Sequence, residues 1–167
     1  MQETVNGVTT TFTMDLNPST SLRAGAGFTQ ALNDGTNSYI YGVGRIAQLN
    51  SGTEYFLGDA LGSVRQLTDA GGAITYSRAY DPFGVVTSTL GSSQTSYAFT
   101  GEFLGDSTQL TYLRARYYSS GMGRFLTRDT WMGDYNRLLS LNRWIELIHI
   151  LAQFAAVERV QSFGGIL

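Results

Sequence analysis

The chain contains no cysteine and no lysine, and only two of its 167 residues are proline. Without cysteine there is no disulfide and no thiolate nucleophile, and the compartment stays undetermined. No apolar run reaches the length of about 18 residues that a membrane-spanning helix needs, and the first residues lack the features of a signal peptide. The formal net charge of −2 offers no basic excess, which argues against broad electrostatic binding to phosphate.

Glycine and aromatic residues are abundant instead, with 20 glycines, ten tyrosines and nine phenylalanines. This composition favours short strands joined by glycine-containing turns, so we expect a mainly β protein. All eleven basic residues are arginine. Because a guanidinium group stacks on rings and bridges carboxylates, these arginines suit a tyrosine-rich sheet.

The first third of the chain reads as strands with one interruption. Apolar residues alternate with threonines from Val8 to Met14, which predicts a strand. Residues 17–27 form a turn-rich stretch that we interpret as a loop insertion. Asn33, Asp34 and Gly35 lie between two strand-like runs and predict a hairpin, since Asp and Gly tolerate the positive φ of such a turn.

Three similar segments place glycines at Gly44, Gly62 and Gly84, with spacings of 18 and 22 residues. A β-branched residue follows two positions after each glycine. Units of this length cannot bury a face alone, so we expect them to stack as neighbouring hairpins of one ribbon.

The turns of these repeats have their own local chemistry. Asp81, Pro82 and Gly84 occupy the first, second and fourth positions of a type I turn, and Asp59 and Gly62 repeat the pattern without the proline. A metal or acid–base site is the alternative for the two aspartates. Turn closure explains their spacing fully, so we interpret them as structural, and we expect no metal and no cofactor.

The segment from 112 to 129 holds four arginines among aromatic residues. We expect Arg114, Arg116 and Tyr118 on one face of a strand, a turn at 119–123, and Arg124 on the return strand of the same core hairpin. Nucleic-acid binding is the alternative for this stripe, but the acidic charge balance favours a structural face.

After residue 136 the apolar period changes to three and four residues. It predicts an amphipathic helix over 141–160 with Ser140 as its N-cap, in a packing or self-association role rather than as a membrane anchor. His149 falls among its polar positions, and no second imidazole exists to make a zinc site or a catalytic triad.

Four spaced motifs resemble the RHS-repeat (YD-repeat) proteins, and more narrowly their RHS-repeat-associated core. They begin at Asp59 (DALGSVR), Tyr80 (YDPFG), Arg114 (RARYY) and Gly123 (GRFL), and they occur in family order. The resemblance is most specific over residues 54–136. It divides the chain into N-terminal strands with a weaker repeat (1–53), the core (54–136) and the helix with its tail (137–167).

The resemblance implies a β-ribbon that spirals into a shell around a C-terminal toxin domain used in bacterial competition. In many members the core also cuts the chain downstream by aspartyl autoproteolysis. Asp129, beside Arg128, best matches a family catalytic aspartate, and Asp106 is the candidate for its partner. An aspartyl dyad needs two carboxylates close enough to share a proton. This chain lacks the Asn-Pro and Asp-Pro-x-Gly segments that precede the cleavage point in the family.

We therefore expect an antiparallel β-hairpin ribbon, a partial β-shell, with a C-terminal amphipathic helix. Its expected function is a structural shell or plug segment, here truncated or fragmentary, and its expected partners are other RHS repeats or a toxin domain. Self-association through the helix is a further possibility, and nucleic acid and a membrane span are not expected. Two alternatives stay open, an autoprotease with vestigial activity at most and a cell-surface module that binds carbohydrate. Secretion or surface display would follow only from membership of a full-length family protein.

Overall fold

The computed structural model describes residues 2–5, 7–15, 30–42, 44–136 and 138–144. Within these ranges the regular structure consists of β-strands and short 3-10 helices, which confirms a mainly antiparallel β protein. The predicted loop at 17–27 and the predicted helix from residue 145 onward lie outside the described residues. Ser140, the predicted N-cap, lies inside the 3-10 helix η4 (Leu138–Leu141), where its hydroxyl bonds the backbone of Asp134.

The chain separates into two compact units, Met1–Ala79 with Val86–Gly101, and Tyr80–Val85 with Glu102–Leu167. The division at residues 53 and 136 stays a prediction.

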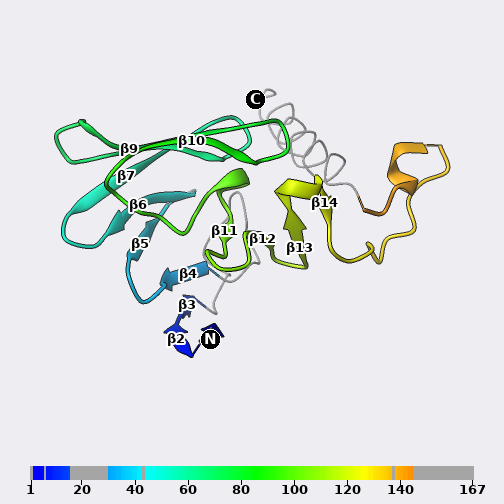
Figure 1. Ribbon diagram of the computed structural model, residues 1–167, viewed down its shortest axis with the longest axis horizontal. Coiled ribbons are helices and arrows are strands. Elements are labelled where there is room, and N and C mark those ends of the chain that lie inside the picture. Colours follow the sequence, from blue (N-terminus) through cyan, green and yellow to red (C-terminus); the bar gives the residue numbers. More distant parts are fainter. Residues whose placement is uncertain (1, 6, 16–29, 43, 137, 145–167) are drawn as a thin grey trace, which may run out of the picture. The chain divides into compact units, whose positions relative to one another are not determined.

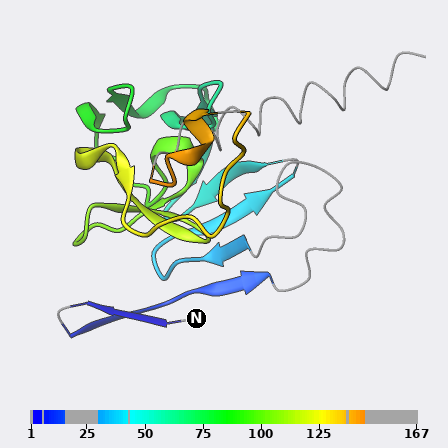
Figure 2. The same cartoon turned by 90° about the vertical axis from the view of Figure 1, so that its right-hand side faces the viewer.

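Eight strands cross the main sheet of the first unit in chain order (Figure 1). They are β3 (Thr13–Asp15), β4 (Gln30–Asn33), β5 (Ser38–Tyr41), β6 (Arg45–Leu49), β7 (Thr53–Gly58), β8 (Val64–Thr68), β9 (Ile74–Tyr80) and β10 (Val86–Gly91). Antiparallel pairs link each strand from β3 to β8 with the next, and β10 lies beside β9. β1 (Gln2–Val5) and β2 (Val8–Thr11) form a separate hairpin, drawn in dark blue in Figure 2.

The two faces of the main sheet differ in burial. Leu67 is fully buried and pairs with Phe56 on one side and with the buried Tyr76 on the other. On the opposite face, Ile40 and Tyr55 stay 44% and 40% exposed. Because side chains alternate along a strand, one face of this sheet carries the core and the other presents apolar side chains.

Three hairpin loops of the sheet have the same hydrogen-bond pattern. In each, the aspartate N–H donates to the carbonyl four residues later, and its Oδ1 accepts the N–H groups two and four residues later, at 2.8–3.0 Å. The loops begin at Asp59, Asp69 and Asp81. The fourth residue of each is a glycine with a φ of +80° to +89°, a region that side chains avoid.

This geometry changes the alignment of the repeats. Gly62 and Gly84 share their positive φ with Gly72, whereas Gly44 does not have one. Gly44 instead lies in a tighter connection, in which the Gly42 N–H donates to its carbonyl at 2.8 Å. The alignment of Gly44 with the other two was therefore wrong, because coinciding glycines do not reveal loop length.

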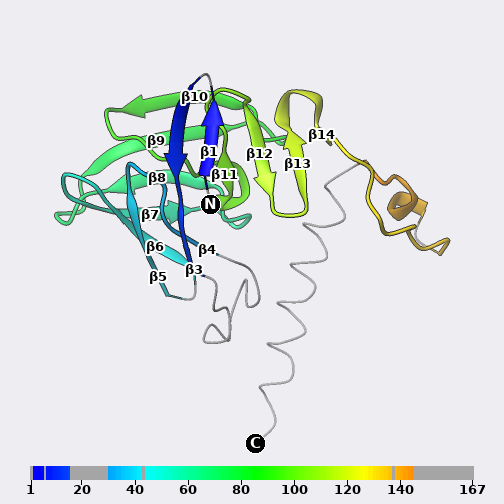
Figure 3. The same cartoon turned by 90° about the horizontal axis from the view of Figure 1, so that it is seen from below.

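The second unit contains a four-stranded antiparallel sheet in chain order, whose middle strands β12 and β13 lie side by side in Figure 3. The strands are β11 (Phe103–Leu104), β12 (Leu110–Leu113), β13 (Arg116–Ser119) and β14 (Arg124–Phe125). The 3-10 helix η3 (Ser120–Met122) and Gly123, with a φ of +64°, make the turn expected at 119–123.

The continuous strand expected through Arg114 is interrupted. Leu113 pairs with Arg116, so Arg114 and Ala115 are the two central residues of a tight hairpin, and Arg114 has a φ of +62°. Such turns usually use Asn, Asp or Gly at these positions. Since neither residue is a turn former, no local pattern in the sequence indicates the reversal.

Candidate functional site

After β10 the chain returns across the core face of the first unit as a strap, residues 92–101. Side chains of the sheet hold it at intervals. Gln48 Nε2 donates to the Gln94 carbonyl at 2.9 Å, and Ser96 Oγ donates to Asp34 Oδ2 at 3.0 Å. Near its end the strap includes the 3-10 helix η2 (Phe99–Gly101), whose Thr100 N–H donates to Ser63 Oγ at 3.1 Å. The strap therefore replaces a second layer over this face of the sheet.

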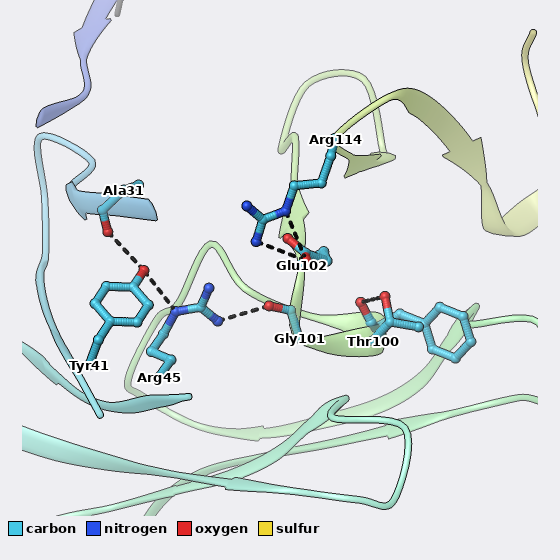
Figure 4. Close-up of polar contacts among 8 residues, drawn as sticks. Ala31, Tyr41, Arg45, Thr100, Gly101, Glu102 and Arg114 are labelled. Atoms are coloured by element: carbon cyan, nitrogen blue, oxygen red, sulfur yellow. Dashed lines mark hydrogen bonds and ion pairs between the residues drawn. The ribbon is translucent and has the colours of Figure 1, made fainter. Parts of the chain in front are cut away.

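Arg45, on β6, lies among aromatic rings from the sheet and from the strap. Its guanidinium carbon is 3.0 Å from the ring centroid of Tyr97 and 5.6–5.7 Å from the rings of Tyr39, Tyr41 and Phe56. Its Nη1 donates to the carbonyl of Gly101 at 2.8 Å, as Figure 4 shows. A cation over several ring faces is favourable because each face carries negative charge density.

Asp34 is a buried carboxylate beside this cluster, 4% exposed. Its Oδ1 accepts the N–H groups of Thr36 and Asn37, and its Oδ2 accepts the hydroxyls of Tyr39 and Ser96. Burial, with the Asp34 hydrogen bond and charge, raises the pKa of Tyr39 far above its usual range. The phenol is thereby kept as a donor to the carboxylate.

Glu54 is the second carboxylate under the strap. Burial raises its pKa, but hydrogen bonds from Ser93, Thr75 and Gln48 oppose burial, and the pKa ends below its ordinary value. Gln48 Nε2 donates to Glu54 Oε2 at 2.9 Å, and the Ser93 hydroxyl donates to Oε1. The charged form of Glu54 is the form that holds the strap.

In the second unit, Asp129 forms an ion pair with Arg116. Its Oδ2 lies 2.7 Å from Nη2 of Arg116, and both side chains are less than one-fifth exposed. Its Oδ1 accepts the Trp131 N–H at 2.9 Å, as in an Asx turn. Arg116 also lies over the Phe125 ring, 3.5 Å from its centroid, and its Nη1 donates to the Arg143 carbonyl.

Asp106, the predicted partner of Asp129, is exposed in the loop between β11 and β12. This loop leads into Leu110, which pairs with Ser119 at one end of the β12–β13 ladder. Arg116, which holds Asp129, pairs with Leu113 at the other end. The register thus places the two carboxylates by opposite ends of the ladder, and the dyad stays a prediction.

The repeat aspartates use their side chains within their own loops. Oδ1 of Asp59 and Oδ1 of Asp81 each accept two backbone N–H groups of their own loop. Gly62 and Gly84 supply the positive φ of the fourth loop position, and Pro82 occupies the second position of its loop. Within the described ranges, no group of three or more metal-ligating side chains comes together.

The arginines of the core hairpin are divided by its register. Arg116 and Tyr118 are two apart on β13 and share a face, and Tyr118 is buried against Phe125. Arg124 pairs with Ser119 and so belongs to the other face. Arg114, in the turn, forms an ion pair with Glu102 at 3.1 Å, which is also drawn in Figure 4.

Sequence reasoning missed the most connected residues, namely Arg45, Asp34, Glu54 and Tyr97. One sign of the cluster was available in the sequence. Tyr39 and Tyr41 are two residues apart on one strand, and Arg45 begins the next strand after a glycine turn, so the three side chains can share a face of the hairpin. Tyr97 comes from the strap, and no local pattern pairs a strap residue with a strand so distant in sequence.

A sheet built from successive hairpins, three of which share the same Asp-x-x-Gly loop, defines a hairpin-repeat β-ribbon protein. The chain belongs to the teneurin YD-shell family of RHS/YD-repeat proteins, whose match covers residues 31–151.

The chain is similar to much longer proteins. It is 33% identical over 135 residues to the tRNA3(Ser)-specific nuclease WapA of Bacillus spizizenii, a match that covers 77% of this chain and 6% of the relative. Among solved structures, TcdB2–TccC3 matches with 22% identity and a TM-score of 0.55, over 70% of this chain and 6% of that one. A Photorhabdus luminescens Tc holotoxin pore matches with 21% identity and a TM-score of 0.54, over 70% and 6%. At this identity the structures show a common fold. Among the described residues, no helix is long and apolar enough to cross a membrane.

Proposed function

We propose that this chain forms part of the wall of a YD shell that encloses a C-terminal toxin domain. One observation carries the proposal: every strand of the main sheet lies beside the next strand in sequence, and three of the connecting loops are Asp-x-x-Gly loops of one geometry. A ribbon of this kind can be lengthened by further repeats without a change in design.

The two faces of the ribbon suit a wall. Charge-assisted hydrogen bonds hold the strap over one face, whereas the other face carries exposed Ile40, Tyr55 and Leu57. The chain spans 6% of the length of the relatives it matches, so enclosure and the enclosed domain are properties that we propose for the whole assembly.

A chimaera tests the proposal. Residues 31–151 would replace the matching segment of the nuclease WapA, and the rate at which an added protease removes the last domain would be compared with that of unmodified WapA. We expect equal protection. If the last domain is cleaved as fast as the same domain expressed alone, while circular dichroism shows an intact β-sheet, this chain does not form a wall.

A second proposal is that Asp129 catalyses self-cleavage of the chain, and the contact between Asp129 and Arg143 supports it. The Asp129 N–H donates to the Arg143 carbonyl at 3.0 Å, and Arg143 Nη2 donates back to the Asp129 carbonyl. Asp129 is thus held beside the segment that leads toward the family's cleavage point. A version extended with a family-like downstream segment should be cut, and its Asp129→Asn variant should not. An uncut extended chain would count against a catalytic role.

A further inference from the structure

The outermost strand β10 leaves one edge of the main sheet open. In the described part of the chain, β9 is its single neighbour in the sheet. All six of its residues are exposed, including Val86 at 38% and Leu90 at 68%. An edge strand presents a row of backbone N–H and C=O groups that can pair with another chain.

The β10 edge lacks the features by which proteins usually protect such strands. Its sequence from Val86 to Gly91, VTSTLG, contains no charged residue and no proline. The opposite outer strand, β3, is shorter, with three residues, and it ends in the charged Asp15. The two edges of one sheet are therefore built differently.

We propose that β10 is a self-pairing interface, at which two copies of this chain join their β10 strands antiparallel about a two-fold axis. The strand sequence is self-complementary in one register, centred on Ser88. Val86 then lies opposite Leu90 of the second copy, and Thr87 lies opposite Thr89 of the second copy. Apolar and threonine pairs across antiparallel strands are favourable, and no like charges meet.

Two copies would thereby extend the sheet across the axis. This interface uses the residues of β10 and no enclosed domain, so it goes beyond the proposed shell function. A dimer could form whether or not the chain encloses a toxin.

The absence of cysteine makes the register directly measurable. Opposed residues of an antiparallel pair have Cβ atoms about 4.5–5.5 Å apart, near the separation that a disulfide bridges. Ser88→Cys should therefore crosslink with itself under mild oxidation. Thr87→Cys and Thr89→Cys should crosslink poorly alone and efficiently when mixed. Ser51→Cys, in an exposed turn, gives the background rate of collision.

Sedimentation of the full chain over a range of concentrations supplies a second measurement. We expect a monomer–dimer equilibrium, and we expect Ser88→Lys, which opposes two ammonium groups on the axis, to raise the dimer Kd by about fivefold. Ser51→Lys should leave the Kd unchanged. A chain that sediments as a monomer throughout overturns the proposal. So do dimers in which Ser88→Cys crosslinks no faster than Ser51→Cys, since they use another surface.

Discussion

The guanidinium carbon of Arg45 lies 3.0 Å from the centroid of the Tyr97 ring, which joins a strand of the main sheet to the strap that covers it. Tyr39 meets the same ring edge-on, with centroids 4.9 Å apart. Burial raises the pKa of Tyr97 above its usual range, and the opposing charge of Arg45 does not reverse this. The first unit therefore holds the Arg45 guanidinium beside the neutral phenols of Tyr39 and Tyr97.

Arg45→Ala should lower the free energy of unfolding by about 2 kcal/mol, because it removes both the ring contacts and the hydrogen bond to the Gly101 carbonyl. Arg45→Lys should recover only part of this loss, since an ammonium group lacks the planar fork. Urea denaturation measures both variants. Arg128→Ala, at an exposed position, serves as the control, and an equal loss there would contradict a special role for Arg45.

Asp59→Ala should cost about 1 kcal/mol, because the N–H groups of Leu61 and Ser63 lose their acceptor. Asp59→Asn keeps an oxygen at the Oδ1 position and should cost less. Thermal unfolding followed by circular dichroism compares the two with Asp106→Ala, whose side chain is exposed in another loop. Equal losses for the alanine and asparagine variants would show that the acceptor oxygen is not what matters.

Gly91→Ala should destabilise the first unit by about 3 kcal/mol or more. Gly91 has a φ of +97°, and an added Cβ would overlap the backbone carbonyl of Thr75. Gly52→Ala is the matched control, because its Cβ would point into open space. Chemical denaturation of both variants checks the difference, and a stable Gly91→Ala protein would show that β9 and β10 can separate locally.

Stability should fall in acid partly through Glu54. Because its folded pKa lies below the ordinary value of 4.5, its contribution is present above that value and is lost as the pH falls through the lowered pKa. The stability difference between the wild type and Glu54→Gln should therefore be largest near neutral pH and narrow in acid. Urea denaturation of both proteins at neutral pH and at acidic pH measures this difference in stability. A difference that stays constant with pH would exclude Glu54 as a contributor to acid sensitivity.

Local chemistry explains which features the sequence could predict. Asp81 closes its loop by accepting N–H groups from within it, so the identities of Asp81, Pro82 and Gly84 alone indicate the turn. The hairpin turn at Arg114 was missed because its positive φ follows from the pairing of β12 with β13 rather than from a turn-forming residue. Whether Asp106 and Asp129 meet depended in the same way on strand register, which residue types alone do not specify.

The sequence by itself determined the strand-rich composition, the Asp-x-x-Gly loops and membership of the YD-repeat family, because these depend on residues close together in the chain. Only the tertiary structure decided that the strap returns over the sheet, that Arg45 meets Tyr97 and that Asp129 is bound by Arg116. It also decided that β10 is an outer strand of the sheet among the described residues. Each of these depends on where distant segments pack, and packing is selected by the burial and pairing of the whole unit rather than by any local pattern.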